Sequence, residues 1–263
     1  MSNQHSFVVC AYKESPYLEE CIESLMAQKV KSDVKIVTST PNSYIEKIAD
    51  KYSVPLIVNT GKTGISEDWN FAYSMADTPY MTITHQDDVY LPEYTEELLR
   101  LVKKEKRPLI FFTDYGEIRD GKVCKNNELL KVKRMMLIPL ENRLMWKSRW
   151  MRRRVLSMGS PICCPSVAYC KDNLPERIFR QHFRSCEDWE AWEKLSKYKG
   201  SFIYCKKLLV YHRIHADSET TAIIQDNGRS AEEYEMYKKF WPVVIAKLLV
   251  RMYARGQKSN GIE

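Results

Sequence analysis

The sequence predicts an α/β protein with a mostly parallel, doubly wound, Rossmann-like sheet, followed by a helical region at the C-terminus. Three observations predict this class. Short runs of apolar and β-branched residues alternate with amphipathic helical patterns over residues 1–115. One of these runs stops abruptly at two adjacent carboxylates, Asp87 and Asp88. Helical periodicity then dominates the last part of the chain, from residue 229 to residue 255.

The first half of the chain is expected to contain five strands. Each is a short apolar run, and apolar residues repeat at three- and four-residue spacing between them. Ser15 and Pro16 open the first helical pattern, because serine caps a helix and proline suits its first turn. The expected strands are 6–12, 34–38, 55–59, 80–84 and 108–113, and the helical patterns cover 18–26, 43–52, 66–76 and 98–102.

The second half of the chain is less regular, above all in residues 116–160. No internal repeat, low-complexity tract or clear linker divides it. We therefore expect one domain over residues 1–225 and a C-terminal helical extension over residues 226–263. The remaining expected elements are a strand at 161–170, a helix at 187–197, a strand at 201–211 and the helical region at 229–255.

Composition indicates an ordinary globular protein. Of 263 residues, 44% are hydrophobic and 11% aromatic, enough for a sizeable core. The N-terminal residues lead into a strand-like run without the pattern of a signal peptide, and no apolar stretch approaches the ~18 residues that span a membrane. The eight cysteines form no CxxC pair. This favours reduced thiols over disulfides or zinc ligands, so we expect a cytoplasmic protein.

Positive charge is concentrated in one segment. The net charge is +7, and residues 131–154, here called the basic segment, hold nine Lys or Arg residues against Glu141 alone. Such a surplus faces an anionic partner or forms a solvated arm. Trp146 and Trp150 would suit nucleic acid, which is the main alternative to an enzyme. The interleaved Met, Leu and Ile side chains favour an anionic membrane surface instead, and we expect no nucleic-acid partner.

Residues 241–255 show a second amphipathic pattern. Lys247, Arg251 and Arg255 recur every four residues and share one helical face, with apolar side chains on much of the remainder. Together with the basic segment, this pattern predicts peripheral association with the inner face of an anionic membrane. The alternative is a helix that packs on its own domain or on a second subunit of a homo-oligomer.

Asp87 and Asp88 end an expected strand, and a Leu-Pro pair then opens a helical pattern. In an open α/β sheet, ligands bind beyond the carboxyl ends of the strands. Two carboxylates there suit Mg²⁺ or Mn²⁺, which take oxygen ligands from protein and substrate phosphates. Adjacent aspartates also occur in ordinary turns. The same pair would serve a metal-dependent nucleotidyltransferase or phosphatase.

Five motifs in order resemble those of the family-2 glycosyltransferases. The resemblance covers about residues 5–225, and five ordered motifs are more specific than any one of them. It implies a GT-A fold and a nucleoside-diphosphate sugar donor. The motifs are FVVCAYKE (7–14), GKTGISEDWN (61–70), HQDDVYLP (85–92), CEDWEAW (186–192) and HRIHADSETT (212–221).

The resemblance implies roles for particular residues. Asp188 would be the catalytic base and Glu187 an acceptor-site residue, although Ser185 to Asp188 also has the spacing of a helix capping box. Asp88 would bind the metal, Mn²⁺ or Mg²⁺, with His215 completing its site. The residues expected to bind the nucleotide sugar are Ala11, Tyr12, Glu14, Thr38, Lys62, Gly64, Asp87 and Arg213, of which Lys62 and Arg213 would neutralise the diphosphate.

The sequence departs from the family pattern in three places. Lys13 stands where the family usually has Asn, and Thr38 and Ser39 stand where it usually has an Asp pair that contacts the base. His85 and Gln86 replace the start of the commoner Asp-x-Asp-Asp motif. The base of the donor therefore stays open. We expect a metal-dependent, inverting hexosyltransferase that acts on a saccharide or lipid-linked acceptor, as in bacterial surface polysaccharide synthesis.

Overall fold

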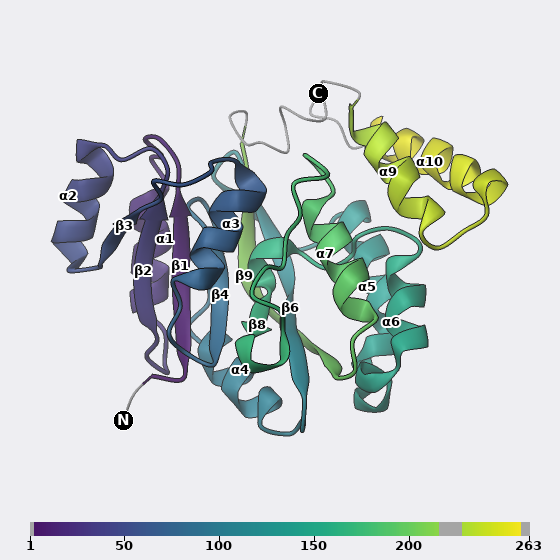
Figure 1. Ribbon diagram of the computed structural model, residues 1–263, viewed down its shortest axis with the longest axis horizontal. Coiled ribbons are helices and arrows are strands. Elements are labelled where there is room, and N and C mark those ends of the chain that lie inside the picture. Colours follow the sequence, from purple (N-terminus) through teal and green to yellow (C-terminus); the bar gives the residue numbers. More distant parts are fainter. Residues whose placement is uncertain (1–2, 216–227, 259–263) are drawn as a thin grey trace.

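The computed structural model describes residues 3–215 and 228–258 (Figure 1). Its strands are β1 His5–Ala11, β2 Asp33–Thr38, β3 Leu56–Val58, β4 Tyr80–His85, β5 Val89–Tyr90, β6 Pro108–Arg119, β7 Lys122–Cys124, β8 Ala168–Cys170 and β9 Ser201–Ile214. Its α-helices are α1 Leu18–Met26, α2 Ser43–Tyr52, α3 Ile65–Ser74, α4 Tyr94–Val102, α5 Glu128–Glu141, α6 Arg149–Leu156, α7 Glu187–Ser196, α9 Gly228–Lys238 and α10 Val243–Lys258. Three short 3₁₀ helices, Arg143–Lys147, Cys164–Ser166 and Lys171–Asn173, join these elements.

One mixed sheet runs through the described part of the chain. Its strand order is β3-β2-β1-β4-β8-β6-β9-β5, and β7 pairs with β6 outside this path. The first four strands are parallel, as predicted, and the register pairs Ala11 with Thr38 and Cys10 with His85. The carboxyl ends of β1, β2 and β4 therefore meet at one edge, where an α/β sheet binds its ligands.

Helices pack on both sides of this parallel half. In Figure 1, α3 crosses in front of the sheet and α1 lies behind it. The ends of α2 coincide with the prediction because Asn42 caps it, accepting hydrogen bonds from the amides of Tyr44 and Ile45, and Ser53 closes it in a left-handed conformation. Buried apolar side chains on these helices and on β1 form a continuous core.

The second half of the sheet departs from the prediction. The strand expected at 161–170 is wrong for most of its length, because only Ala168–Cys170 pairs, antiparallel to β4 and β6. Pro165, which has no amide hydrogen to donate, lies in the preceding 3₁₀ helix. Beyond β8, the long strands β6 and β9 run parallel and carry the chain back to the same edge.

The irregular pattern of residues 116–160 hides regular structure. β6 extends to Arg119, β7 forms a hairpin with it, and α5 and α6 follow. Pro139 inside α5 and the 3₁₀ helix between α5 and α6 interrupt the periodicity, which explains why the sequence pattern looked weak. The basic segment is thus mostly helical.

The C-terminal helical region consists of two helices, α9 and α10, with Pro242 between them. Side chains of α9 reach the core, where Met236 and Tyr237 are buried and Tyr237 packs edge-on against Trp189 of α7 at 5.1 Å between ring centroids. On α10, Val244 and Leu248 are exposed. Within the described ranges, no helix combines the length and apolar character needed to cross a membrane.

Candidate active site

A cavity of about 670 Å³ opens at the carboxyl edge of the sheet. Its walls come from the ends of β1, β2, β4 and β9, from the start of α3, and from the start of α7 on the far side. Of the residues predicted to form a site, eight line it: Ala11, Tyr12, Thr38, Gly64, Asp87, Glu187, Asp188 and His215. The topology therefore brings together motifs that are up to about 200 residues apart in the sequence.

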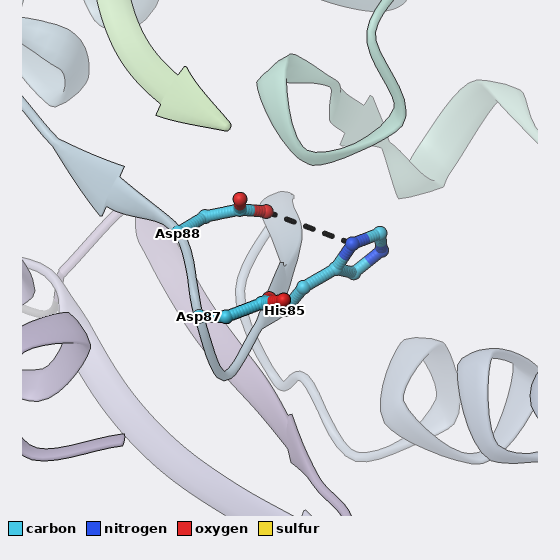
Figure 2. A group of neighbouring side chains, drawn as sticks. All are labelled: His85, Asp87 and Asp88. Carbon is cyan, nitrogen blue, oxygen red and sulfur yellow. Dashed lines mark ion pairs between the residues drawn. The ribbon is translucent and has the colours of Figure 1, made fainter. Parts of the chain in front are cut away.

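The turn after β4 carries His85, Asp87 and Asp88, whose side chains lie on one side of the backbone (Figure 2). Asp88 is 0% exposed, although it lies in the turn just after the strand. Its Oδ1 accepts hydrogen bonds from the backbone amide of Arg213 at 3.0 Å and from Nδ1 of His212 at 2.8 Å. Asp88 is therefore buried because it ties the β4 turn to the end of β9.

The three side chains form a candidate metal centre. Each offers one ligand atom, and these atoms lie within 4.8 Å of one another. Asp88 Oδ2 and His85 Nε2 are buried and have no hydrogen-bond partner among the described residues, while His85 Nδ1 lies 3.6 Å from Asp88 Oδ2. A buried carboxylate oxygen without a partner is costly unless a cation or water completes its coordination. The cluster therefore suits a divalent cation.

Histidines surround the carboxylates of this turn. His215 Nε2 lies 3.1 Å from Oδ2 of Asp87. Burial acts to raise the pKa of Asp87, but the hydrogen bond with His215 and the nearby His212 and His85 outweigh it and lower the pKa. Burial acts to lower the pKa of His212, yet the contact with Asp88 raises it. The Asp87 carboxylate therefore favours its charged form.

Arg213 does not line the cavity. Its Nε donates to the carbonyl of Asp87 at 2.9 Å, its guanidinium pairs with Glu20 at 2.5 Å, and it lies over the ring of Tyr17 at 4.3 Å. Through these contacts Arg213 supports the backbone of the turn at Asp87 without reaching the cavity.

Two other predicted residues also lie outside the cavity wall. Glu14 and Lys62 are exposed, and Lys62 lines a separate, shallow pocket with Arg177 and Arg180. The carbonyl of Lys62 accepts a hydrogen bond from Asn59. The side chain of Lys62 is therefore on the far side of the glycine-containing loop from the metal cluster's cavity.

The expected nucleotide side of the cavity contains two residues that sequence reasoning did not single out. Gln86 belongs to the turn of residues 85–88, here called the metal turn. It joins this turn to β1 through two hydrogen bonds with the backbone of Tyr12, at 2.9 and 3.0 Å. Asp68 of α3 accepts from Ser39 at 3.0 Å and from Asn59 at 2.8 Å. Asp68 thus places a carboxylate beside the end of β2, where the family's usual Asp pair is missing.

Glu187 and Asp188 are the first two residues of α7, on the opposite wall. Asp188 is half-buried, and its Oδ1 accepts a hydrogen bond from the amide of Trp189. The capping-box alternative does not hold, because Cys186 is the N-cap and makes no side-chain cap, and Ser185 Oγ donates to Glu232 instead.

Three further cavity residues come from distant parts of the chain: Tyr115, Lys133 and Glu233. Lys133 belongs to the basic segment, and its Nζ donates to the hydroxyl of Tyr115 at 2.9 Å. No local pattern separates Lys133 from the other cations of that segment. Its role depends on how α5 packs against β6.

The sequence and the fold together define the class of protein. The sequence pattern described as glycosyl transferase family 2 matches residues 6–159, more than half of the chain. The chain therefore belongs to this family, its fold is GT-A, and it is a glycosyltransferase.

Solved structures support the fold assignment. Residues 1–349 of TarS from S. aureus, in complex with UDP-GlcNAc, match with a TM-score of 0.61 and 16% identity, over 94% of this chain and 70% of that chain. The mannosyltransferase PcManGT from Pyrobaculum calidifontis, in complex with GDP-Man and Mn²⁺, matches with a TM-score of 0.63 and 12% identity, over 95% and 70%. A longer TarS chain is covered over 42% of its length. No curated protein matches the chain.

Proposed function

We propose that this glycosyltransferase moves a sugar from a nucleoside-diphosphate donor to an acceptor hydroxyl, in a metal-dependent reaction that inverts the anomeric centre. One observation carries the proposal. A single cavity is lined by His85 and Asp87, which form a cluster with buried Asp88, and also by Glu187 and Asp188 at the start of α7. The cluster suits a departing diphosphate, and the start of α7 offers a base to an acceptor.

Asp87, Asp88 and His85 would hold the cation, with His215 beside them. A bound Mn²⁺ or Mg²⁺ supplies Lewis-acid stabilisation of the charge that develops on the diphosphate. Carboxylates suit both ions, and imidazole nitrogen is a better ligand for Mn²⁺ than for Mg²⁺. Asp87 faces the cavity and would meet the donor, whereas buried Asp88 would bind the cation through Oδ2, which has no hydrogen-bond partner in the described ranges.

The donor would lie across the ends of β1 and β2, with its diphosphate toward the metal turn. Ala11, Tyr12, Thr38 and Gly64 line this side, and Lys133 adds a cation to the cavity wall. TarS binds UDP-GlcNAc and PcManGT binds GDP-Man in their solved complexes. A nucleotide sugar is therefore the proposed donor, with its base to be determined by a panel of nucleotides.

Asp188 would act as the general base. A carboxylate on the first turn of α7 is held by backbone that the sheet and α9 position, and it faces the cavity. Removing the proton of an acceptor hydroxyl during attack lets the hydroxyl displace the diphosphate from the opposite face in one step. Glu187, buried beside it, would contact the acceptor.

The acceptor is proposed to be a saccharide, free or lipid-linked, as in bacterial surface polysaccharide synthesis. Exposed apolar side chains on α5, α6 and α10 accompany exposed cations, and this combination suits an anionic membrane surface. The exposed apolar residues include Met135, Ile138, Leu144, Trp150, Val244 and Leu248.

The reaction class is tested by the product that leaves the donor. The protein is incubated with UDP-, dTDP-, GDP- and CDP-sugars, with Mn²⁺, with and without saccharide acceptors. Acceptor-dependent release of free nucleoside diphosphate is the expected result. Release of sugar 1-phosphate would instead indicate attack on a phosphorus atom of the donor. A nucleotidyltransferase would then transfer the nucleoside monophosphate to the acceptor, and a hydrolase would release it free.

A further inference from the structure

Glu232 of α9 makes a dense set of contacts with the loop before α7. Its Oε1 accepts from the amide of Arg184 at 2.8 Å. Its Oε2 accepts from the amide of Ser185 at 2.8 Å, from the Ser185 hydroxyl at 2.6 Å and from the amide of Cys186 at 3.1 Å. One carboxylate therefore binds three consecutive backbone amides and one hydroxyl.

The loop that Glu232 holds leads directly into the proposed catalytic wall. Arg184, Ser185 and Cys186 line the cavity, and Glu187 and Asp188 follow without a gap. Cys186, the N-cap of α7, gives no side-chain cap to the helix. Glu232 binds the amides just before the helix, and its negative charge near the start of α7 interacts favourably with the helix dipole.

Glu232 is itself held in place by the packing of α9. The neighbouring Glu233 is 1% exposed and lines the cavity, and Tyr237 packs on Trp189. At the end of the helix, Lys239 Nζ pairs with Glu190 of α7 at 2.7 Å. Contacts that follow Glu232 along the helix therefore hold α9 against α7 and support its carboxylate beside the loop.

We propose that Glu232 is a positioning residue of the transfer reaction, which sets the location of Asp188 by anchoring residues 184–186. The inference rests on the proposed role of Asp188 as base. A misplacement of a catalytic group by about 1 Å costs on the order of 100-fold in rate. Through Glu232, helix α9 becomes part of the active site, although it follows all the strands of the sheet in the sequence.

Two substitutions at this position separate charge from shape. In Glu232→Gln, the amide oxygen can take the place of Oε2 and keep three contacts, but the NH₂ group then faces the Arg184 amide, donor against donor. In Glu232→Ala, all four contacts are lost. Glu235→Ala is the matched control, because Glu235 lies one turn away on the same helix and is exposed, paired with Lys238.

The experiment measures transfer kinetics and amide hydrogen exchange on the full chain. It uses Mn²⁺ and the donor that the panel of nucleotide sugars identifies. We expect kcat to fall at least ~10-fold in Glu232→Ala and less in Glu232→Gln, with donor KM within about twofold. Protection of amides 184–186 should fall in the same order, and Glu235→Ala should match wild type. A kcat within twofold of wild type in Glu232→Ala overturns the proposal, as does unchanged protection of amides 184–186.

The Asp188→Asn variant keeps this result separate from the base assignment. Full activity in Asp188→Asn would refute Asp188 as base. Full activity in Glu232→Ala, together with an inactive Asp188→Asn, would refute the positioning role alone.

Discussion

The metal turn and the basic segment both concentrate like charge in the sequence, but the fold places their charged side chains differently. In the metal turn, Asp87 faces the cavity, and Oδ2 of Asp88 has no hydrogen-bond partner among the described residues. In the basic segment, most cations bind groups of the same chain. Arg134 pairs with Asp114, Arg143 and Lys147 with Glu105, and Arg153 with Glu193.

Arg152 shows the difference most clearly. It is 0% exposed, donates to the carbonyls of Ser196, Tyr198 and Gly200, and stacks over Phe202 at 4.7 Å. Charge in a sequence therefore indicates function only where topology leaves it facing a cavity or solvent. After β4 the topology leaves Asp87 facing the cavity, and in the basic segment it does the same for Lys133 but buries Arg152.

The largest expected effect is on the catalytic wall. Asp188→Asn keeps the size of the side chain and an oxygen that accepts from Trp189, but removes the basicity. Loss of a positioned base typically costs ~10²–10⁴ in rate. We expect transfer to slow at least ~100-fold while donor binding and melting temperature stay near wild type. Turnover close to normal, or a product of retained anomeric configuration, would remove Asp188 from this role.

Substitution of either aspartate of the metal turn should weaken nucleotide binding, but only substitution of Asp88 should also lower the stability of the fold. Asp87→Asn is expected to weaken Mn²⁺-dependent binding of nucleoside diphosphate at least ~10-fold with little loss of stability, since Asp87 lies on the cavity wall. Asp88→Ala should weaken it as well, and should also destabilise the fold by about 1–3 kcal/mol, because the Arg213 amide and His212 lose their acceptor.

Calorimetry with and without Mn²⁺ and thermal melting measure these two effects on the aspartate variants. Unchanged metal-dependent affinity in both variants would mean that the turn binds no cation. Equal stability of the two variants would mean that the hydrogen bonds of Asp88 do not support β9.

Substitution of Arg152, the buried cation of the basic segment, should change stability rather than binding. Burial lowers the pKa of Arg152 to about 10, so its environment already opposes the charge. Arg152→Met keeps much of the packing but leaves three carbonyls without their donor, and we expect a loss of about 3 kcal/mol in urea unfolding. Exposed Arg149→Met in the same helix is the control, with an expected change within about 0.5 kcal/mol. Equal effects would contradict an internal role for this charge.

Membrane association is the smallest effect predicted. Exposed Trp150 and Leu248 would insert into the interface of anionic vesicles, helped by nearby cations such as Arg149 and Lys247. Trp150→Ser and Leu248→Ser should reduce salt-dependent sedimentation with these vesicles. Val123→Ser, at an exposed apolar site on β7, should not. Absence of sedimentation with the wild-type protein would contradict the proposal.

The sequence predicted the fold well in those parts of the chain where local residue patterns determine the structure. The parallel half, β1 to β4, and helix α2 with its Asn42 cap were predicted within one or two residues. The prediction failed at 161–170, where an apolar run with Pro165 forms a 3₁₀ helix, and in 116–160, where Pro139 breaks the helical pattern. In both places the final structure depends on packing between distant segments.

The residues of the candidate site also fall into two groups, those predicted from sequence motifs and those that depend on the packing of distant segments. Asp87, Asp188 and His215 were found from motifs and line the cavity. Lys133 and Glu232 could not be found, because their contacts depend on where α5 and α9 pack. Glu14 and Lys62 belong to motifs but lie outside the cavity wall, because a motif fixes the position of a residue in the chain and not the direction of its side chain.

The central claim is that a nucleoside diphosphate and a divalent cation meet at the metal turn. Thermal melting of the wild-type protein with UDP, dTDP, GDP and CDP, each with and without Mn²⁺, tests it most directly. A ligand at 100 times its Kd stabilises the folded state by about 2.7 kcal/mol. This corresponds to a rise in Tm of roughly 5–10 °C for a chain of this size. We expect such a rise with at least one nucleotide, only when Mn²⁺ is present, and a rise no more than about half as large in Asp87→Asn. No rise with any nucleotide, or a rise that does not depend on the cation, would contradict it.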